Sequence, residues 1–223
     1  MFIHFGKPNR LSAVGQTQLD VAELKRRFDI GVLDDEPFVQ ANALRAHGFR
    51  IVELGGDIKS VEQVASYPIV ICDIKGVGRA FGSKYEGAHV LSEIRKAYPD
   101  KYLVAFTGMT YDASYNEKLN SADKSATKDT SIDLWTQTLE TGLRAVGDPR
   151  ERWIRLRPTL LSKGVELYEL LLLEQAFIKS IDQHDVGAFS KKTKSLQMSG
   201  ELGDLLAKFA AASLVQLIEV AAK

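Results

Sequence analysis

Short apolar runs alternate with longer amphipathic segments from Phe28 to about residue 147, and this alternation restricts the fold more than any other feature. The apolar runs predict strands at 30–33, 49–54, 69–72, 102–106 and 125–127, the last of them short and weak. The amphipathic segments predict helices at 37–47, 58–67, 88–98, 111–119 and 132–146. Strands and helices in strict alternation indicate a parallel, doubly wound α/β sheet, covered on both faces through right-handed crossovers.

The chain changes character after residue 147, where strand signals end. Leucine at helical spacing covers 156–181, and a second amphipathic or buried stretch covers 202–222. Between them, 187–200 is a polar connection that we expect to be partly helical. We therefore divide the chain into an N-terminal extension (1–27), an α/β domain (28–147) and a C-terminal helical hairpin or bundle (148–223).

The composition excludes several classes of protein. Hydrophobic residues make up 45% of the chain and charged residues 26%, as in an ordinary globular protein. Lys+Arg and Asp+Glu both total 29, and this balance argues against binding of nucleic acid through bulk charge. The single Cys72 excludes an internal disulfide. No stretch reaches the roughly 18 apolar residues of a membrane span, and no signal peptide precedes the domain, so we expect a cytoplasmic protein.

Polar side chains follow four of the five predicted strands. They are Asp34 and Asp35 after the first strand, Asp73 after the third, Thr107 after the fourth and Lys128 after the fifth. Since ligands of doubly wound sheets bind outside the carboxyl ends of the strands, we expect these side chains to lie together. Three neighbouring carboxylates favour a divalent cation, and oxygen ligands at a phosphate-handling site favour Mg²⁺. A carboxylate can itself act as a nucleophile and form an aspartyl phosphate.

Several motifs extend this pattern over most of the α/β domain. They are Val32-Leu33-Asp34-Asp35-Glu36-Pro37, Ile71-Cys72-Asp73, the helix from Glu86-Gly87 to Ile94-Arg95, Ala105-Phe106-Thr107-Gly108, and Ala122-Asp123 followed by Lys128. In this order they resemble the receiver domain of two-component response regulators. The resemblance implies a flavodoxin-like fold with five parallel strands, to which the C-terminal helical module is appended.

The resemblance also implies a role for each residue of the site. Asp73 accepts the phosphoryl group, Thr107 hydrogen-bonds the phosphoryl oxygens, and Lys128 pairs with the phosphoryl group. The implied Mg²⁺ ligands are Asp35, Asp73, the backbone carbonyl of Lys75 and, through water, Asp34. Metal and lysine together neutralise the charge that develops during phosphoryl transfer.

Three positions depart from the pattern of the family. The loop 76–85 is several residues longer than usual and lacks the usual proline, and we expect it to form a flexible lid that carries Lys75, Arg79 or Lys84 near the phosphoryl group. Asp129 follows Lys128 where the family has proline, and Ser125 stands where an aromatic switch residue is expected. The resemblance therefore implies an atypical receiver with intact acceptor chemistry and an altered signalling readout.

The leading hypothesis is a two-component response regulator rather than an enzyme, with slow self-dephosphorylation at most. It would accept its phosphoryl group from a sensor histidine kinase or a phosphotransfer protein in a phosphorelay. Residues 148–223 would then relay the signal by binding a protein partner or forming a homodimer. The alternative is a degenerate receiver that acts as a phosphorylation-independent interaction module. A third hypothesis, an enzymatic activity within 148–223, has no supporting set of catalytic residues.

Overall fold

A computed structural model describes residues 10–14, 20–108 and 118–221 of the chain. The chain folds as two compact units. The first, here called the sheet unit, is Leu19–Gly147, and the second, the helical unit, is Asp148–Lys223 together with Met1–Gln18. Most of the predicted helix at 111–119 lies outside the described residues.

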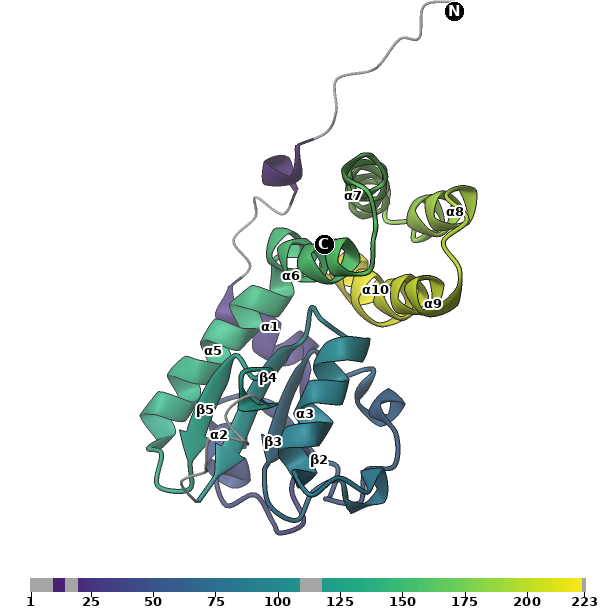
Figure 1. Cartoon of the computed structure of the whole chain (residues 1–223). Helices are drawn as coiled ribbons and strands as arrows, with labels where there is room; N and C mark the ends of the chain where they lie inside the picture. The colour runs from purple at the N-terminus through teal and green to yellow at the C-terminus, as the bar shows by residue number, and fades with distance from the viewer. Residues whose placement is uncertain (1–9, 15–19, 109–117, 222–223) are drawn as a thin grey trace, which may run out of the picture. The chain divides into compact units, whose positions relative to one another are not determined.

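The sheet unit contains five parallel strands in the order β2-β1-β3-β4-β5 (Figure 1). They are β1 Asp29–Leu33, β2 Arg50–Glu53, β3 Ile69–Asp73, β4 Tyr102–Thr107 and β5 Lys124–Thr127. All five predicted strands are confirmed, and their order is the flavodoxin-like order of doubly wound folds. The central strand β3 is buried along its whole length and pairs with β1 on one side and β4 on the other.

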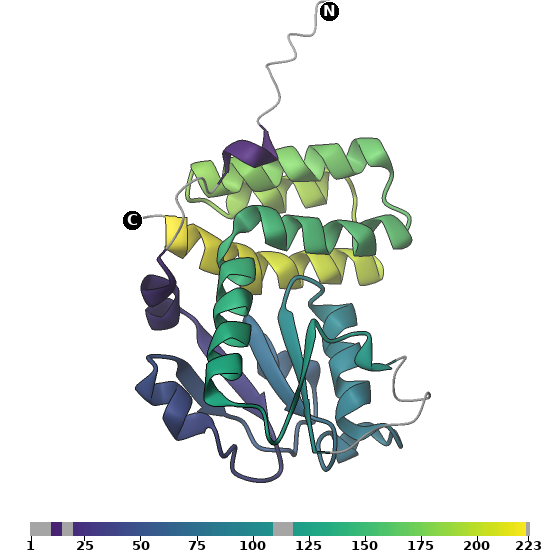
Figure 2. The ribbon, with the colours of Figure 1, turned by 90° about the vertical axis from the view of Figure 1, so that its left-hand side faces the viewer.

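Helices cover both faces of this sheet, as the alternating pattern predicts (Figures 1 and 2). One face carries α1 Val21–Arg27, α2 Ala41–Ala46 and α5 Ile132–Gly147. The opposite face carries α3 Glu86–Ala97 and the short 3-10 helix η2 Val61–Val64, and η3 Arg79–Phe81 lies in the loop before α3. Under the α5 face, the rings of Phe38, Phe106 and Trp135 pack edge to face or tilted, with centroids 5.3 to 5.7 Å apart.

The predicted helix at 58–67 is wrong in extent, because only the single 3-10 turn η2 forms there. The Gln63 side-chain oxygen accepts hydrogen bonds from the backbone N–H groups of Lys59 and Ser60, and the Ser60 hydroxyl accepts one from the N–H of Glu62. These contacts form a capping box at Ser60, so the helical turn begins after this residue and not at residue 58. The valines at 61 and 64 also have weak helix propensity because they are β-branched.

Within the residues that the structure describes, the helical unit contains helices and no strand (Figure 2). They are η1 Leu11–Ala13, α6 Pro149–Ser162, α7 Leu167–Asp182, α8 Gly187–Ser195, α9 Gly200–Lys208, the π-helical segment η4 Phe209–Leu214 and α10 Val215–Ala221. The leucine-rich stretch 156–181 thus forms two helices. A turn at Gly164 separates them, where the N–H groups of Gly164 and Val165 donate to the carbonyls of Leu161 and Leu160.

Aromatic rings form the centre of the helical core. Trp153 of α6 stacks on Phe177 of α7 with ring centroids 5.1 Å apart, and Phe189 and Phe209 pack against the same indole. The indole Nε1–H donates to Glu174 Oε2 at 2.6 Å, so the polar atom of this buried side chain is satisfied. Among the described residues, no helix is both long enough and apolar enough to cross a membrane.

Candidate functional site

Three aspartates meet at the carboxyl edge of the sheet. Asp34 and Asp35 follow β1, and Asp73 is the last residue of its neighbour β3. Each offers a carboxylate oxygen, and these three oxygens all lie within 4.8 Å of one another. Only 6% of Asp34 and 4% of Asp73 is exposed, whereas Asp35 lies at the surface. The structure therefore brings together the carboxylates that the strand ends predict, here called the acidic cluster.

Lys128 approaches the acidic cluster from the loop after β5. Its Nζ lies 3.9 Å from Asp73 Oδ2 and 3.5 Å from Glu36 Oε2. Its backbone N–H donates to the carbonyl of Thr107, the last residue of β4, at 3.2 Å. Since Phe106 pairs with Asp73 across β3 and β4, Thr107 lies one residue beyond the acidic cluster at the same edge. Glu36 is the member of this set that the sequence did not single out, although it directly follows Asp34-Asp35.

Burial dominates the electrostatics of the buried carboxyls. It raises the pKa of Asp34, and repulsion from Asp73 adds to this, while a hydrogen bond from the N–H of Glu36 at 2.9 Å opposes it. Burial likewise raises the pKa of Asp73 against hydrogen bonds from backbone N–H groups. For Lys128, burial lowers the pKa, but Asp73 and Glu36 together outweigh it and leave the pKa raised. Close, partly desolvated carboxylates of this kind suit a divalent cation. The cation offsets both the cost of burying the negative charges and the repulsion between them.

The long loop after Asp73 is packed beside the acidic cluster. Its residues Gly76, Val77 and Gly78 are buried, and the N–H of Gly78 donates to the carbonyl of Gly56 at 3.0 Å. Of the three basic residues that we expected near the phosphoryl group, Arg79 places its guanidinium beside the acidic cluster, with Nη2 3.6 Å from Asp35 Oδ2. Lys84 instead places its Nζ 5.0 Å from the ring centroid of Tyr85.

Asp123, from the motif before Lys128, has a structural position instead. Its Oδ2 accepts hydrogen bonds from Arg95 Nη2 of α3 and from the backbone N–H of Leu103 of β4, both at 2.7 Å. The same arginine donates to the carbonyls of Pro99, Lys101 and Ser121. Asp123 and Arg95 therefore fix the start of β5 against β4 and α3, at the edge opposite to the acidic cluster.

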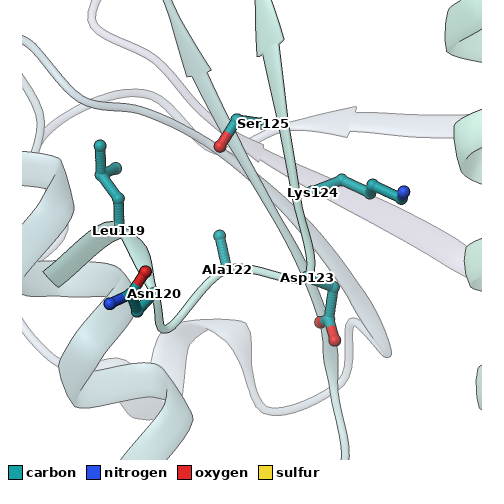
Figure 3. Close-up of a pocket in the computed structure, with 6 residues that line it drawn as sticks. All are labelled: Leu119, Asn120, Ala122, Asp123, Lys124 and Ser125. Atoms are coloured by element: carbon teal, nitrogen blue, oxygen red, sulfur yellow. The ribbon is translucent and has the colours of Figure 1, made fainter. Parts of the chain in front are cut away.

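A shallow hollow of about 460 Å³ lies beside the start of β5 and not at the acidic cluster (Figure 3). Its lining residues are Leu119, Asn120, Ala122, Asp123, Lys124 and Ser125. Ser125, which stands at the position of the expected aromatic switch, is exposed on this surface. The carboxylate of Asp123, the acidic residue of this lining, is already paired with Arg95 at 2.7 Å.

Comparison with known proteins gives structural neighbours only. No protein-family model and no curated protein matches the chain. The beryllofluoride-activated receiver domain dimer of NtrC4 matches with 15% identity and a TM-score of 0.39, over 52% of this chain and 95% of that one. A response regulator protein from Burkholderia pseudomallei with a phosphorylated aspartic acid, calcium ion and citrate matches with 15% identity and a TM-score of 0.42, over 81% and 97%.

NtrX from Brucella abortus in complex with ATP matches with 19% identity and a TM-score of 0.42. The match covers 70% of this chain but 35% of NtrX, so the chain spans about a third of that protein. At such identities the likeness is one of fold. The chain has a flavodoxin-like, five-stranded parallel sheet.

Proposed function

We propose that the chain is an atypical two-component response regulator whose sheet unit accepts a phosphoryl group on Asp73 in a Mg²⁺-dependent reaction. The observation that supports this most strongly is the acidic cluster itself, with carboxylate oxygens within 4.8 Å and the Lys128 ammonium 3.9 Å from Asp73. The cluster lies at the carboxyl edge of the sheet, where doubly wound proteins bind their ligands. The phosphoryl donor would be a sensor histidine kinase or a phosphotransfer protein, and the setting is the cytoplasm.

The proposed reaction is a displacement at phosphorus. A carboxylate oxygen of Asp73 forms a bond to phosphorus while the bond to the donor nitrogen or oxygen breaks, and the leaving group takes its proton from the surroundings. Lys128 stabilises the negative charge on the transferring group, and Thr107 donates a hydrogen bond to it. Water later attacks the acyl phosphate, which returns the Asp73 carboxylate and releases inorganic phosphate. This hydrolysis of the aspartyl phosphate is slow, and we propose no other enzymatic activity for the chain.

The cation would be held by the residues that the structure gathers around Asp73. Asp35, Asp73 and the backbone carbonyl of Lys75 would bind it directly, and Asp34 would act through water. When bound, Mg²⁺ supplies charge neutralisation and orientation of the phosphoryl oxygens. The raised pKa values of Asp34 and Asp73 fit this arrangement, because a nearby cation favours the ionised form that both roles need.

Incubation with Mg²⁺ and either acetyl phosphate or beryllofluoride tests the proposal. Intact-mass measurement should show the gain of one phosphoryl group from acetyl phosphate, and the gain should be lost in Asp73→Asn. Asp57→Asn is the matched control, because Asp57 lies in the same unit on an exposed turn and should leave labelling unchanged. Absence of labelling at millimolar Mg²⁺, or labelling that persists in Asp73→Asn, would contradict the proposal.

The second candidate is a receiver-like interaction module that works without phosphorylation. Two observations favour it: Arg79 Nη2 lies 3.6 Å from Asp35 Oδ2, so a guanidinium already offsets part of the cluster charge, and Ser125 replaces an aromatic at the readout position. This candidate predicts that partner binding is the same for the wild type and for Asp73→Asn. The first candidate predicts that the phosphoryl mimic changes partner binding or self-association in the wild type alone.

The helical unit offers a surface for such an interaction. Leu167, Tyr168 and Leu171 lie near the start of α7 and are 73%, 63% and 47% exposed. Exposed apolar side chains that gather in this way are typical of protein-binding surfaces. We propose that this surface binds a protein partner or a second copy of the chain. Sedimentation with and without beryllofluoride tests self-association, and Leu171→Glu should reduce it while Lys179→Glu, on the same helix, should not.

A further inference from the structure

Glu86, the first residue of α3, combines two unusual features. Its Oε2 accepts a hydrogen bond from the backbone N–H of Gly76 at 2.7 Å, across the long loop. Its φ is +44°, a left-handed conformation that residues other than glycine adopt rarely. Such strain persists only where the surrounding structure imposes it, and it gathers at functional sites. Neither feature belongs to the residues that the sequence motifs assigned to the site.

The hydrogen bond to Glu86 fixes the direction of a particular carbonyl. The N–H of Gly76 belongs to the same peptide group as the C=O of Lys75, and no described peptide is cis. In a planar trans peptide, the N–H and the C=O point in opposite directions. A carboxylate that holds this N–H therefore turns the Lys75 carbonyl away from Glu86.

Lys75 and Gly76, the two residues joined by this peptide, lie between two carboxylates of the acidic cluster. On one side, the N–H of Lys75 donates to Asp73 Oδ1 at 3.3 Å. On the other side, Gly76 lies so close to Asp35 that a Cβ added there would be 2.1 Å from Asp35 Oδ2. The peptide group that Glu86 orients thus joins two residues that lie against Asp73 and Asp35, which would bind the cation.

We propose that Glu86 is a positioning residue for the divalent-cation site. It holds the Lys75–Gly76 peptide so that the Lys75 carbonyl faces the cation, and the left-handed backbone at Glu86 brings its carboxylate to Gly76. This inference rests on the proposed function, because it concerns the same cation site. Groups that orient a metal ligand without touching the metal typically change affinity by about 10–100-fold.

Mn²⁺ binding to the full chain, followed by electron paramagnetic resonance of the free ion and checked by Mg²⁺ competition, tests this role. Glu86→Ala should weaken binding by about 10–100-fold. Glu86→Gln should stay within about threefold of the wild type, because its amide oxygen still accepts the Gly76 hydrogen bond. Glu86→Gly should bind as weakly as Glu86→Ala, while its cation-free unfolding midpoint is at or above that of Glu86→Ala, because glycine accepts a positive φ.

Glu93→Ala is the matched control. Glu93 lies on the same helix, and its Oε1 pairs with Lys96 Nζ at 2.7 Å, within the helix and not with the loop. It should bind Mn²⁺ like the wild type. If the wild type binds no Mn²⁺, or if Asp73→Asn binds it equally well, the proposed function itself fails. If those two proteins differ as expected but Glu86→Ala and Glu86→Gly bind like the wild type, the positioning role is overturned. Equal losses in Glu86→Gln and Glu86→Ala would also overturn it, in favour of simple charge attraction.

Discussion

Asp34 and Asp73 are almost fully buried, and burial is the largest cause that raises the pKa of each carboxyl. A carboxyl with a raised pKa takes up protons more readily in the folded protein than in the unfolded chain. Its favourable effect on stability is therefore complete below the ordinary pKa of about 4 and is lost as the pH rises through the raised value. At neutral pH and without a cation, these charges destabilise the fold that carries them.

Replacement of one charge should consequently stabilise the cation-free protein. Asp73→Asn is expected to raise the thermal unfolding midpoint by about 2–4 °C at pH 7, an effect of order 1 kcal/mol. The gain should shrink as the pH falls through the raised pKa of Asp73 and should be lost near the ordinary pKa of about 4. Added Mg²⁺ should stabilise the wild type and leave Asp73→Asn unchanged. Calorimetry of both proteins from about pH 4 to pH 7 measures these unfolding midpoints. A midpoint for Asp73→Asn below that of the wild type at pH 7 would contradict the prediction.

A second prediction concerns two glycines of the long loop. Gly76 has φ +83° and faces the Asp35 carboxylate, whereas Gly82 has φ +65° and nothing within 4 Å of an added Cβ. Gly82→Ala should cost about 1 kcal/mol through backbone strain alone and should keep its cation affinity. Gly76→Ala should cost on the order of 3 kcal/mol and lose cation affinity as well. Urea denaturation and Mn²⁺ titration separate the two effects, and equal behaviour of both variants would refute the close contact.

At the scale of elements, β5 depends on a contact far from the acidic cluster. Arg95 and Asp123 join with Nη2 and Oδ2 2.7 Å apart, and both side chains are largely buried. Because β5 is a short edge strand that leads directly to Lys128, this ion pair positions the lysine indirectly.

Loss of that ion pair should be costly, because it leaves a partly buried carboxylate without its guanidinium. Arg95→Ala is expected to lower the free energy of unfolding by about 2–3 kcal/mol. Glu93→Ala, which breaks the Glu93–Lys96 pair and the longer Glu93–His89 contact of the same helix, should change it by at most about 0.5 kcal/mol. Chemical denaturation of both variants is the measurement, and a similar small loss in both would show that β5 is held by other contacts.

The sequence predicts elements better than it predicts contacts between them. All five strands follow from apolar runs, and the acidic cluster follows from the residues at their ends, because parallel strands share an edge. The bounds of the 3-10 turn η2 were not predicted, because its start is set by the Gln63 side chain, which hydrophobic periodicity does not record. The contact between Glu86 and Gly76 was not predicted for a similar reason. It joins two positions outside regular periodicity, and the left-handed backbone at Glu86 has no sequence pattern. The contact between Lys128 and Glu36 was predictable, because Glu36 directly follows Asp34-Asp35 at the same edge of the sheet.

At the scale of the whole molecule, each of the two units carries its own tryptophan. Trp135 lies in the core of the sheet unit, and Trp153 stacks on Phe177 in the core of the helical unit. Each indole is fully buried and changes its emission when its core opens. The chain therefore contains a separate fluorescent reporter for each unit.

These reporters predict where cation binding acts. In Trp153→Phe, which leaves Trp135 as the reporter, saturating Mg²⁺ should raise the unfolding midpoint by several degrees, because a ligand stabilises the state that binds it. In Trp135→Phe, where Trp153 reports, the midpoint should move less. For each variant, the midpoint with Mg²⁺ is compared with the midpoint of the same variant without Mg²⁺. The loss of stability caused by the tryptophan substitution is therefore the same in both measurements and cancels. Equal shifts would mean that the two units unfold as one cooperative body.

Gly87 has a consequence for sequence variation. A Cβ added there would be 1.9 Å from the backbone carbonyl oxygen of Asp73, and the N–H of Gly87 donates to the carbonyl of Ile74 at 3.0 Å. A backbone atom cannot yield as a flexible side chain can, so every other residue type would displace either α3 or the backbone of Asp73. Among chains that descended from the same ancestor, this position should therefore vary less than Glu36 or Arg79, although it carries no functional group. A glycine in the first turn of α3 can therefore mark distant descendants even where the surrounding side chains have changed.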